Sequence, residues 1–463
     1  MPDFDVVVIG GGPAGYSAAL RAAELGSRVA MIESEKPGGA CVHHACIPTE
    51  ILLDAALKHV EARELAIFGV FDVGERFNFA RAAARKDALV KQMAEGIRSA
   101  LRMHDVALIE GRAAFVSDKA VSVAGRGGSR EVSAEAFVIA TGTRWEPPQI
   151  PGIGPERILT TDAVQALPSA PGSVLVLAGG PGEVDFGFEY ATLLAVAGAE
   201  VTLVTPHPRL LPALDATLLG AARAALTDMG VKVIEAVADI RADGDKVAVK
   251  GMGGTSIVPA EIVVAADVRR PYFETLNLSA AGVQSNGEII VDGGCRTNVP
   301  NIFAAGDVTR GLMLSGAAIH MGEVAGSNAS GEAVTTRLSG LPRVIRGLHE
   351  IAWVGRSEDA ARAEGFEVVT GVVDLSFNAR AVALGARTGI VKVVAERELG
   401  QILGVHAVGP VASEVVSVAA GLIQAEATVH DLAAMVAWHP SMTEGLIEAA
   451  RRARWSAGDA GRS

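Results

Sequence analysis

The chain has 463 residues, which is too long for a single hydrophobic core, so two or three domains are expected. Its 49% hydrophobic and 20% charged residues are typical of a globular protein, and its net charge of -12 argues against nucleic acid or an anionic membrane as the main partner. We expect no membrane span, because no run approaches about 18 consecutive apolar residues. We also expect no signal peptide, because an apolar strand follows Met1 almost at once. A cytoplasmic location follows from these expectations, and in that reducing compartment a close cysteine pair should be catalytic or metal-binding.

The first elements follow a strand–turn–helix–strand pattern. Residues 6–9 are continuously apolar, as in a strand that is buried on both faces. Gly10, Gly12 and Gly15 form a G-x-G-x-x-G motif, which provides a tight turn, backbone approach to a pyrophosphate and close helix–strand packing. Glu33 ends the second strand, where an acid can accept hydrogen bonds from a ribose diol. The combination predicts a dinucleotide site.

The next stretch, GGACVHHACIPTE (residues 38–50), contains two of the three cysteines, Cys41 and Cys46. At the start of a helix this spacing allows the sulfurs to approach bonding distance, for which Cα atoms lie about 4.4–6.8 Å apart. Zinc bound by the cysteines with His43 and His44 is the alternative. It fits poorly, because zinc sites combine separated C-x2-4-C and H-x3-5-H elements.

Two later segments favour FAD as the dinucleotide. AFVIATGTR (residues 136–144) predicts a strand that ends in a small-residue turn, and VPNIFAAGDVTRG (residues 299–311) predicts another that ends in a Gly-Asp pair. With these segments in place, the chain resembles the pyridine nucleotide–disulfide oxidoreductases from residue 5 to about residue 450. The dihydrolipoamide dehydrogenase branch is the most similar.

The resemblance implies the cofactor and the residues that hold it. It implies that FAD is bound, that Asp307 bonds the ribityl chain, and that Gly39, Thr141 and Gly142 belong to the cofactor site.

The resemblance also gives the cysteines their roles. In this family G-G-T-C-x-N-x-G-C-I-P-S-K follows the first helix, and its cysteines form a disulfide that lies against the flavin. Cys41 would exchange with the substrate thiol, and Cys46 would form the charge-transfer contact with FAD. His43 and His44 replace the usual Asn and an apolar residue, and we expect them to fill space rather than tune Cys41.

The middle of the chain, residues 173–212, should be the family's NAD(P)H-binding βαβ unit. GFEYA (residues 187–191) resembles the family's G-L-E-F-A, but Ala178 and Glu183 stand in place of the first and third glycines. The segment before this helix is also four residues longer than the family pattern, which is about one helical turn. An extra turn would intrude on the pyrophosphate, and Glu183 and Asp185 would repel it.

The expected ribose site also departs from the family. Thr205 stands where users of NAD carry an acid, and His207 with Arg209 is only a weak signal for a 2′-phosphate. Asp267-Val268 replaces an apolar residue and Gly before the Arg-Arg-Pro sequence. We expect this domain to keep its fold and to bind NAD(P)H weakly or not at all. The alternative is that backbone shifts absorb the changes and NAD(P)H still binds.

Glu50 is a further departure. The family has Lys at this position, paired beside the flavin with the Glu that corresponds to Glu189. A cation there stabilises anionic reduced flavin, whereas two close carboxylates raise the pKa of one of them. We expect one of the pair to be protonated and the flavin potential to be lower than in relatives.

The C-terminal part resembles the family's dimerisation domain. Residues 366–410 have strand-like alternation and a hairpin signal at 397–400, and residues 412–440 have helical periodicity. The predicted class is α/β, with two Rossmann-like domains, one for FAD and one similar to an NAD(P) domain, and an α+β dimerisation domain. The predicted boundaries are 1–147 with 267–340 (FAD), 148–266 (NAD(P)-like), 341–450 (dimerisation) and 451–463 (tail). Cys295 is expected to be a buried or inert thiol.

Near the end, AWHPSMTEG contains His439 and Glu444, which match the family's His-Pro-Thr-x-x-Glu. The resemblance implies that Glu444 orients the imidazole and that His439 transfers the proton, as in other base-activated nucleophiles. In the family this pair serves the opposite subunit, so a homodimer is expected.

Together these features predict an enzyme that passes electrons between a dithiol or disulfide and FAD through Cys41 and Cys46. If NAD(P)H is excluded, a dithiol oxidase or substrate dehydrogenase is favoured, acting on a small dithiol or on one delivered by a carrier protein. An ordinary NAD-dependent dihydrolipoyl dehydrogenase and a non-catalytic flavoprotein that acts as a binding partner are the alternatives.

Overall fold

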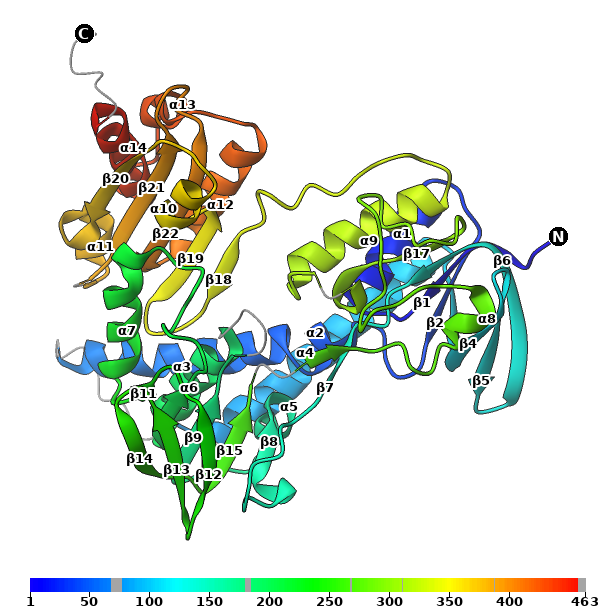
Figure 1. Cartoon of the computed structure of the whole chain (residues 1–463), viewed down its shortest axis with the longest axis horizontal. Coiled ribbons are helices and arrows are strands. Elements are labelled where there is room, and N and C mark those ends of the chain that lie inside the picture. Colours follow the sequence, from blue (N-terminus) through cyan, green and yellow to red (C-terminus); the bar gives the residue numbers. More distant parts are fainter. Residues whose placement is uncertain (68–76, 180–184, 267–268, 310, 387, 457–463) are drawn as a thin grey trace. The chain divides into compact units, whose positions relative to one another are not determined.

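The computed structural model describes residues 1–67, 77–179, 185–266, 269–309, 311–386 and 388–456 (Figure 1). Contacts divide the chain into two compact units. The first comprises Met1–Leu52, Ala80–Glu146 and Val268–Leu338, and the second comprises Leu53–Phe79, Pro147–Asp267 and Ser339–Ser463. The finer division into three domains stays a prediction. Glu183, Asp267 and Val268, which the sequence singled out, lie outside the described residues, as do 457–463 of the tail.

The first unit is built on a mixed sheet in the order β3-β2-β1-β6-β5-β4, with β17 also paired to β6. The pairs β1–β2, β1–β6, β2–β3 and β6–β17 are parallel, whereas β4, β5 and the start of β6 form an antiparallel meander. The strands are β1 Phe4–Ile9, β2 Val29–Glu33, β3 Ala107–Glu110, β4 Arg112–Ser117, β5 Ala120–Gly125, β6 Gly128–Ile139 and β17 Ile302–Ala304. A short ribbon of β7 Thr143–Trp145 and β16 Arg269–Pro271 accompanies this sheet.

Residues 6–9 of strand β1 are all apolar because the sheet is covered on both faces here. Val7 and Ile9 belong to one core cluster, and Val6 and Val8 belong to another that includes residues of the first helix. All four are at most 3% exposed. Burial on both faces explains the continuous apolar run seen in the sequence.

Six α-helices or parts of α-helices belong to the described residues of the first unit. They are α1 Pro13–Glu24, α2 Gly39–His43, the first turns of α3 Cys46–Ile67, α4 Phe79–Met103, α8 Leu278–Ala281 and α9 Ser315–Ala329. Helix α9 packs directly on α1, because a side chain on Gly322 would come within 2.2 Å of the Ala14 carbonyl oxygen and one on Gly326 within 2.4 Å of the Ala18 carbonyl oxygen. This close backbone approach fixes the position of the first residue of α9.

The second unit contains a parallel sheet in the order β11-β10-β9-β15-β8 and an antiparallel sheet in the order β12-β13-β14. The elements are β8 Ile158–Thr160, α5 Thr161–Gln165, β9 Ser173–Leu177, α6 Asp185–Val196, β10 Glu200–Val204, α7 Leu219–Thr227, β11 Lys232–Ile234, β12 Asp239–Asp243, β13 Lys246–Gly251, β14 Gly254–Pro259 and β15 Ile262–Ala265. The order β9, α6, β10 confirms the second βαβ unit that the sequence predicted.

The rest of the second unit is an antiparallel sheet, β18-β19-β22-β21-β20, followed by helices. Its elements are β18 Arg343–Ile345, β19 Glu350–Gly355, α10 Glu358–Ala363, β20 Val368–Asp374, α11 Ala379–Ala383, β21 Ile390–Glu396, β22 Ile402–Gly409, α12 Ala412–Gln424, α13 Val429–Ala434 and α14 Thr443–Ser456. Strands β21 and β22 form the predicted hairpin around residues 397–400. Helix α14 lies against β20, where a side chain on Gly371 would come within 1.8 Å of the Ala449 carbonyl oxygen.

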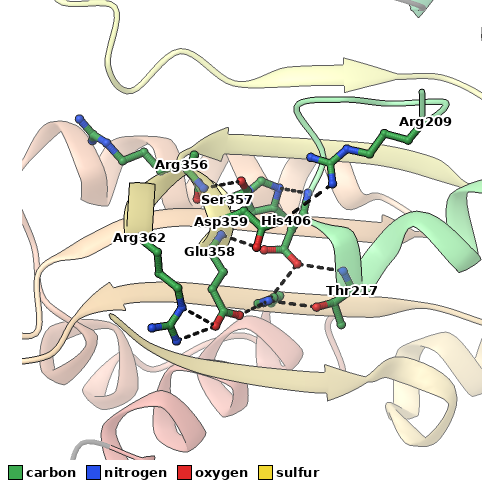
Figure 2. A network of polar contacts seen from close by, with 11 residues as sticks. Arg209, Thr217, Arg356, Ser357, Glu358, Asp359, Arg362 and His406 are labelled. Carbon is green, nitrogen blue, oxygen red and sulfur yellow. Dashed lines mark hydrogen bonds and ion pairs between the residues drawn. The ribbon is translucent and has the colours of Figure 1, made fainter. Parts of the chain in front are cut away.

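A buried ionic network joins this antiparallel sheet to the βαβ region (Figure 2). The ammonium of Lys392 lies 2.9 Å from Asp215 Oδ1 and 2.7 Å from Glu358 Oε2, and Lys392 and Asp215 are only 3% and 2% exposed. His406 is fully buried, accepts the Asp215 backbone N–H at its Nδ1 and bonds the Arg356 carbonyl oxygen through Nε2. Burial opposes ionisation of Asp215, but hydrogen bonds from Lys392 and two backbone N–H groups lower its pKa to about 2. Burial lowers the pKa of His406 to about 4, so the imidazole is neutral.

Over the described part of the chain, none of the helices combines the length and the apolar character needed to cross a bilayer.

Candidate active site

The glycine motif after β1 forms a loop with backbone surfaces that a side chain would obstruct. Gly10 has a φ of +103°, and a side chain there would come within 2.4 Å of the Ala140 carbonyl oxygen. A side chain on Gly15 would lie 1.8 Å from the Gly10 carbonyl oxygen, and one on Gly39 would lie 2.6 Å from Gly12 Cα. Gly10, Gly12, Gly15 and Gly39 are therefore brought together in one cradle at the start of α1, which fits a dinucleotide pyrophosphate.

Glu33 lies at the edge of this cradle. Its Oε2 accepts the Gly11 backbone N–H at 2.6 Å, and its Oε1 accepts the Glu35 backbone N–H at 2.7 Å. A carboxylate can accept about four hydrogen bonds, so two acceptor positions remain for ribose hydroxyls. The geometry fits the predicted role.

Thr141 and Gly142 lie at the end of β6, where the chain turns. Gly142 has a φ of +64°, its carbonyl oxygen accepts the Tyr272 backbone N–H, and the Thr141 hydroxyl donates to the Tyr272 carbonyl oxygen. These bonds tie the turn to the chain beside β16 and keep both residues in the first unit with the cradle.

Asp307 follows Gly306, whose φ is +76°, at the end of β17. Its Oδ2 lies 3.2 Å from a guanidinium nitrogen of Arg269. Burial raises the pKa of the carboxyl group, and the charge of Arg269 opposes this rise. A partly buried carboxylate that is balanced by an arginine is a suitable acceptor for the hydroxyls of a ribityl chain.

The residues present therefore fit FAD: the glycine cradle for the pyrophosphate, Glu33 for the ribose and Asp307 for the ribityl chain all lie in the first unit.

Cys41 in α2 and Cys46 at the start of α3 are side by side, and both are thiols in this structure. Their sulfurs hydrogen-bond to each other, and Cys46 Sγ lies 3.0 Å from the Ser315 hydroxyl oxygen. The hydrogen bond from Cys41 lowers the pKa of Cys46 to about 6; Ser315 and Arg269 act in the same direction, against burial. The same hydrogen bond and burial raise the pKa of Cys41. Cys46 is thus the thiolate of the pair and Cys41 is the protonated thiol at neutral pH.

Of the two histidines between the cysteines, His43 contacts the main chain. His43 Nε2 lies 3.0 Å from the Pro37 carbonyl oxygen, and burial lowers the pKa of the ring. Among the described residues, no group of three or more His, Cys, Asp or Glu side chains is arranged to hold a metal ion. Cys295 is fully buried, which confirms the prediction, and burial raises the pKa of its thiol to about 12.

The predicted catalytic base, His439, and its partner Glu444 lie in the second unit. His439 Nδ1 is 2.9 Å from Glu444 Oε1, and Glu444 Oε2 accepts the Ser441 backbone N–H at 2.8 Å. The hydrogen bond from Ser441, followed by that from His439, lowers the pKa of Glu444. The His439 side chain is 73% exposed, so its Nε2 edge is available to another surface. The structure brings His439 and Glu444 together as predicted.

Glu50 and Glu189 belong to different units, so their predicted pairing stays a prediction. Glu50 borders a pocket of about 460 Å³ in the first unit, lined mostly by apolar side chains of α3 and α4: Ile47, Ile51, Leu89, Gln92 and Met93. In the second unit, Glu189 Oε1 accepts the Arg346 backbone N–H at 3.1 Å.

The second βαβ unit differs from the first at its ligand-facing end. Asp185 begins α6 and pairs with Arg343 at 3.0 Å, so its charge is balanced within the chain. Thr205 is fully buried, and its hydroxyl accepts the His207 backbone N–H. Arg209 donates to the Pro212 carbonyl oxygen at 2.6 Å and lies 3.9 Å from Asp359, so it faces the protein rather than a 2′-phosphate. The four extra residues before α6 fall in a segment outside the described residues.

The sequence interpretation missed Ser315 and assigned no role to Arg269. Both lie beside residues that it did identify, Cys46 and Asp307. Arg269 is the first residue of the Arg-Arg-Pro sequence, which was a usable signal, but nothing in the sequence around Ser315 indicates a contact across 269 positions of chain.

Comparison with family models identifies the family of this chain. A model described as "Pyridine nucleotide-disulphide oxidoreductase" matches residues 4–322, and a model of the dimerisation domain of the same family matches residues 341–450.

Similar proteins agree with these matches. The dihydrolipoyl dehydrogenase of Halobacterium salinarum is 34% identical over 466 residues, which covers 97% of this chain and 96% of the relative. That of Bacillus subtilis is 33% identical, covering 96% of this chain and 97% of the relative. Among solved structures, LpdA from Mycobacterium tuberculosis has a TM-score of 0.85 at 28% identity, covering 97% of this chain and 99% of its own. A copper(II) complex of the HOCl-induced flavoprotein disulfide reductase RclA from Escherichia coli has a TM-score of 0.84 at 26% identity, with the same two coverages. The predicted fold class is confirmed.

Proposed function

Because this chain belongs to the pyridine nucleotide-disulphide oxidoreductase family, we propose that it is an FAD-dependent enzyme that oxidises dithiols through Cys41 and Cys46, with weak or no use of NAD(P)H. The observation that carries the proposal is the asymmetric cysteine pair, in which the Ser315 hydroxyl lies 3.0 Å from Cys46 Sγ and the pKa of Cys46 is lowered while that of Cys41 is raised. A thiolate of low pKa is a good leaving group in thiol–disulfide exchange.

The exchange begins from the Cys41–Cys46 disulfide. A substrate thiol gives its proton to His439 Nε2, and the resulting thiolate attacks Cys41 Sγ, so that a mixed disulfide forms and Cys46 leaves as a thiolate. The second substrate thiol, after losing its proton, attacks the substrate sulfur of the mixed disulfide and releases Cys41, which takes up a proton. The substrate has then lost two electrons and two protons, and the cysteine pair has gained the electrons. FAD, when bound, supplies the two-electron acceptor that returns the pair to the disulfide.

The base for this exchange requires a second chain. Glu444 holds Nδ1 of His439, which directs Nε2 of the exposed ring outward. Apolar side chains around it are also exposed, including Phe377 at 91%, Val436 at 94% and Trp438 at 80%. Exposed apolar side chains in a dimerisation domain support a homodimer in which His439 of one chain serves the cysteines of the other.

Three contacts in the second βαβ unit support the weak use of NAD(P)H. Asp185 is paired with Arg343, Thr205 is buried where an acid would bind a ribose, and Arg209 is bonded to its own chain. The contacts of Thr205 and Arg209 occupy positions that a nucleotide would use, and the Asp185–Arg343 pair ties the start of α6 to β18. The reduced enzyme would therefore pass its electrons to oxygen or to another acceptor. The substrate is proposed to be a small dithiol or a dithiol on a carrier protein, and the cytoplasmic location stays a prediction.

The second candidate is an NAD-dependent dihydrolipoyl dehydrogenase. It is favoured by two relatives that are 33–34% identical over nearly the whole chain and are both dihydrolipoyl dehydrogenases.

One anaerobic experiment separates these functions. NADH, NADPH and then dihydrolipoamide are added in turn to the purified holoenzyme while the flavin absorbance is followed. We expect bleaching by the dithiol and little change with either nucleotide, and the Cys41→Ser variant should lose the dithiol reaction while Cys295→Ser retains it. Rapid bleaching by NADH would contradict the proposal and favour the dehydrogenase, whereas no reduction by any of the three would indicate a binding role.

A further inference from the structure

The hydroxyl of Ser315 is positioned against the sulfur of Cys46. Ser315 is the first residue of α9, a helix of 15 residues, and its Oγ lies 3.0 Å from Cys46 Sγ. The helix is held firmly at this place, because Gly322 and Gly326 allow its backbone to rest on α1. The backbone of α9 is therefore packed on α1, and the first residue of α9 meets Cys46 at the start of α3.

The direction of this hydrogen bond depends on the charge of the sulfur. A thiolate can only accept hydrogen bonds, so the Ser315 hydroxyl must be the donor whenever Cys46 is ionised. The sulfur also lies next to the N-terminal residue of a long helix, where the helix dipole favours negative charge.

Four ionisable neighbours face the same sulfur. Cys41 donates to it and the positive charge of Arg269 stabilises its anion, whereas the negative charge of Asp307 opposes ionisation. Tyr16 also faces the pair: burial and the two cysteines raise the pKa of its phenol, so this group stays neutral. Ser315 supplies an uncharged hydroxyl that is hydrogen-bonded to Cys46.

We propose that Ser315 is a positioning residue whose hydroxyl holds the Cys46 thiolate and makes the Cys41–Cys46 disulfide a stronger oxidant of dithiols. The inference rests on the proposed function. A group that stabilises only the reduced, thiolate form shifts the disulfide–dithiol equilibrium towards reduction, as in other strongly oxidising disulfides.

Reduction of the Cys41–Cys46 disulfide by a dithiol transfers two electrons. A dithiol loses two electrons and two protons and becomes a disulfide, and the Cys41–Cys46 disulfide accepts the two electrons as its S–S bond breaks. Cys41 keeps one proton, and the second proton goes to solvent because Cys46 remains a thiolate above its pKa. Ser315 stabilises this thiolate, and a hydrogen bond from the same hydroxyl also acts to lower the pKa of Cys41.

The test uses the holoenzyme and a set of variants matched in shape. Ser315→Ala removes the hydroxyl; Ser315→Thr keeps it, and Ser315→Val matches threonine in shape without it. Ser330→Ala removes a hydroxyl at the opposite end of the same helix, where Ser330 bonds Ser27 instead.

The first readout is the rate at which iodoacetamide alkylates Cys46 in the reduced protein as a function of pH, resolved by mass spectrometry. In Ser315→Ala and Ser315→Val the midpoint should rise by about one pH unit, since a hydrogen bond to a charged group contributes about 1.5 kcal/mol. Ser315→Thr and Ser330→Ala should keep the midpoint of the wild type.

The second readout is the equilibrium with dithiothreitol, measured from the thiols trapped at Cys41 and Cys46. Above the midpoint, loss of the hydroxyl should make the disulfide roughly tenfold harder to reduce. An unchanged midpoint and equilibrium in both Ser315→Ala and Ser315→Val would overturn the inference. Neither readout needs turnover, so a protein that shows these shifts but fails to oxidise dihydrolipoamide would contradict only the proposed function.

Discussion

The two βαβ units of this chain share a plan but differ in what their loops contact. In the first unit, the loop between β1 and α1 consists of glycines that expose their backbone, and Glu33 has acceptor positions left for a ligand. In the second unit, α6 and the loop after β10 contact the C-terminal part of the same unit. Two of the contacts are the ion pairs Asp185–Arg343 and Asp215–Lys392, and the third is the hydrogen bond from the Arg346 backbone N–H to Glu189.

This difference underlies the proposal that the second unit keeps a nucleotide-binding framework but binds NAD(P)H weakly or not at all. The strands and the helix of the second βαβ unit keep their fold because the parallel sheet is buried on both faces. This burial depends on apolar side chains and not on the loop that would hold a nucleotide. The polar groups at the loop end then need partners, and in the second unit charged side chains of the same chain supply them. Four predictions test this comparison.

The largest effect is expected in the first unit, where Gly15→Val should abolish FAD binding. A side chain there would lie 1.8 Å from the Gly10 carbonyl oxygen, so the cradle cannot keep its shape. We expect the flavin content to fall from about one per chain to almost none. Gly26→Ala is the control, because its site has φ +88° but no atom within 4 Å. Full flavin content in Gly15→Val would contradict the assignment of the cradle.

In the second unit, Lys392→Met should destabilise the fold by about 3–5 kcal/mol, because it leaves the buried Asp215 carboxylate without its cation. Urea unfolding of the holoenzyme measures this loss. The control is Lys91→Met, which removes an exposed cation from α4 and should change stability by less than about 0.5 kcal/mol. Equal stability of the two variants would show that the ionic network does not hold this unit together.

Acid should act on the same network in two steps. The pKa of His406 is lowered to about 4 from its ordinary 6.5, so the unfolded chain takes up a proton first and stability is lost as pH falls from 6.5 to 4. The pKa of Asp215 is lowered to about 2 from 3.8, so its contribution is lost between those values. The first step should cost up to about 3 kcal/mol. His406→Asn should flatten the pH dependence of unfolding between 6.5 and 4, and an unchanged slope would exclude His406 as its source.

The smallest effect is expected from Glu50→Lys, which restores the lysine of the family. Because Thr205 and Arg209 already have partners within the second unit, we expect the rate of reduction by NADH to change by less than about twofold, or under ~0.5 kcal/mol. The flavin potential should rise, since a cation there stabilises anionic reduced flavin, and Glu50→Gln should give a smaller rise. A large gain in NADH reduction would show that Glu50 alone limits nicotinamide use.

Much of the fold was predictable because its signals are local in sequence. The apolar strand before Gly10, the cysteines near a helix start, the hairpin at 397–400 and the pairing of His439 with Glu444 each depend on neighbours a few residues apart. The contacts that distinguish the two units are different. Asp185–Arg343, Asp215–Lys392 and Cys46–Ser315 join residues far apart in the chain, and neither periodicity nor a short motif encodes them.

The interpretation of Asp185 illustrates this limit. The sequence placed an acid at the helix start and predicted repulsion of a phosphate, but the structure gives that acid an arginine partner from β18. If NAD(P)H binds weakly, as we propose, we expect contacts within the chain rather than charge repulsion to be the cause.

The most direct test is the number of dinucleotides that each chain binds. Flavin is extracted and quantified, and the holoenzyme is then titrated with NADH and with NADPH by calorimetry. The account predicts about one FAD per chain and no measurable heat with either nucleotide up to millimolar concentration, a Kd limit of roughly 1 mM or about 4 kcal/mol of binding. Saturable binding of NADH or NADPH at micromolar concentration, with about one site per chain, would contradict it.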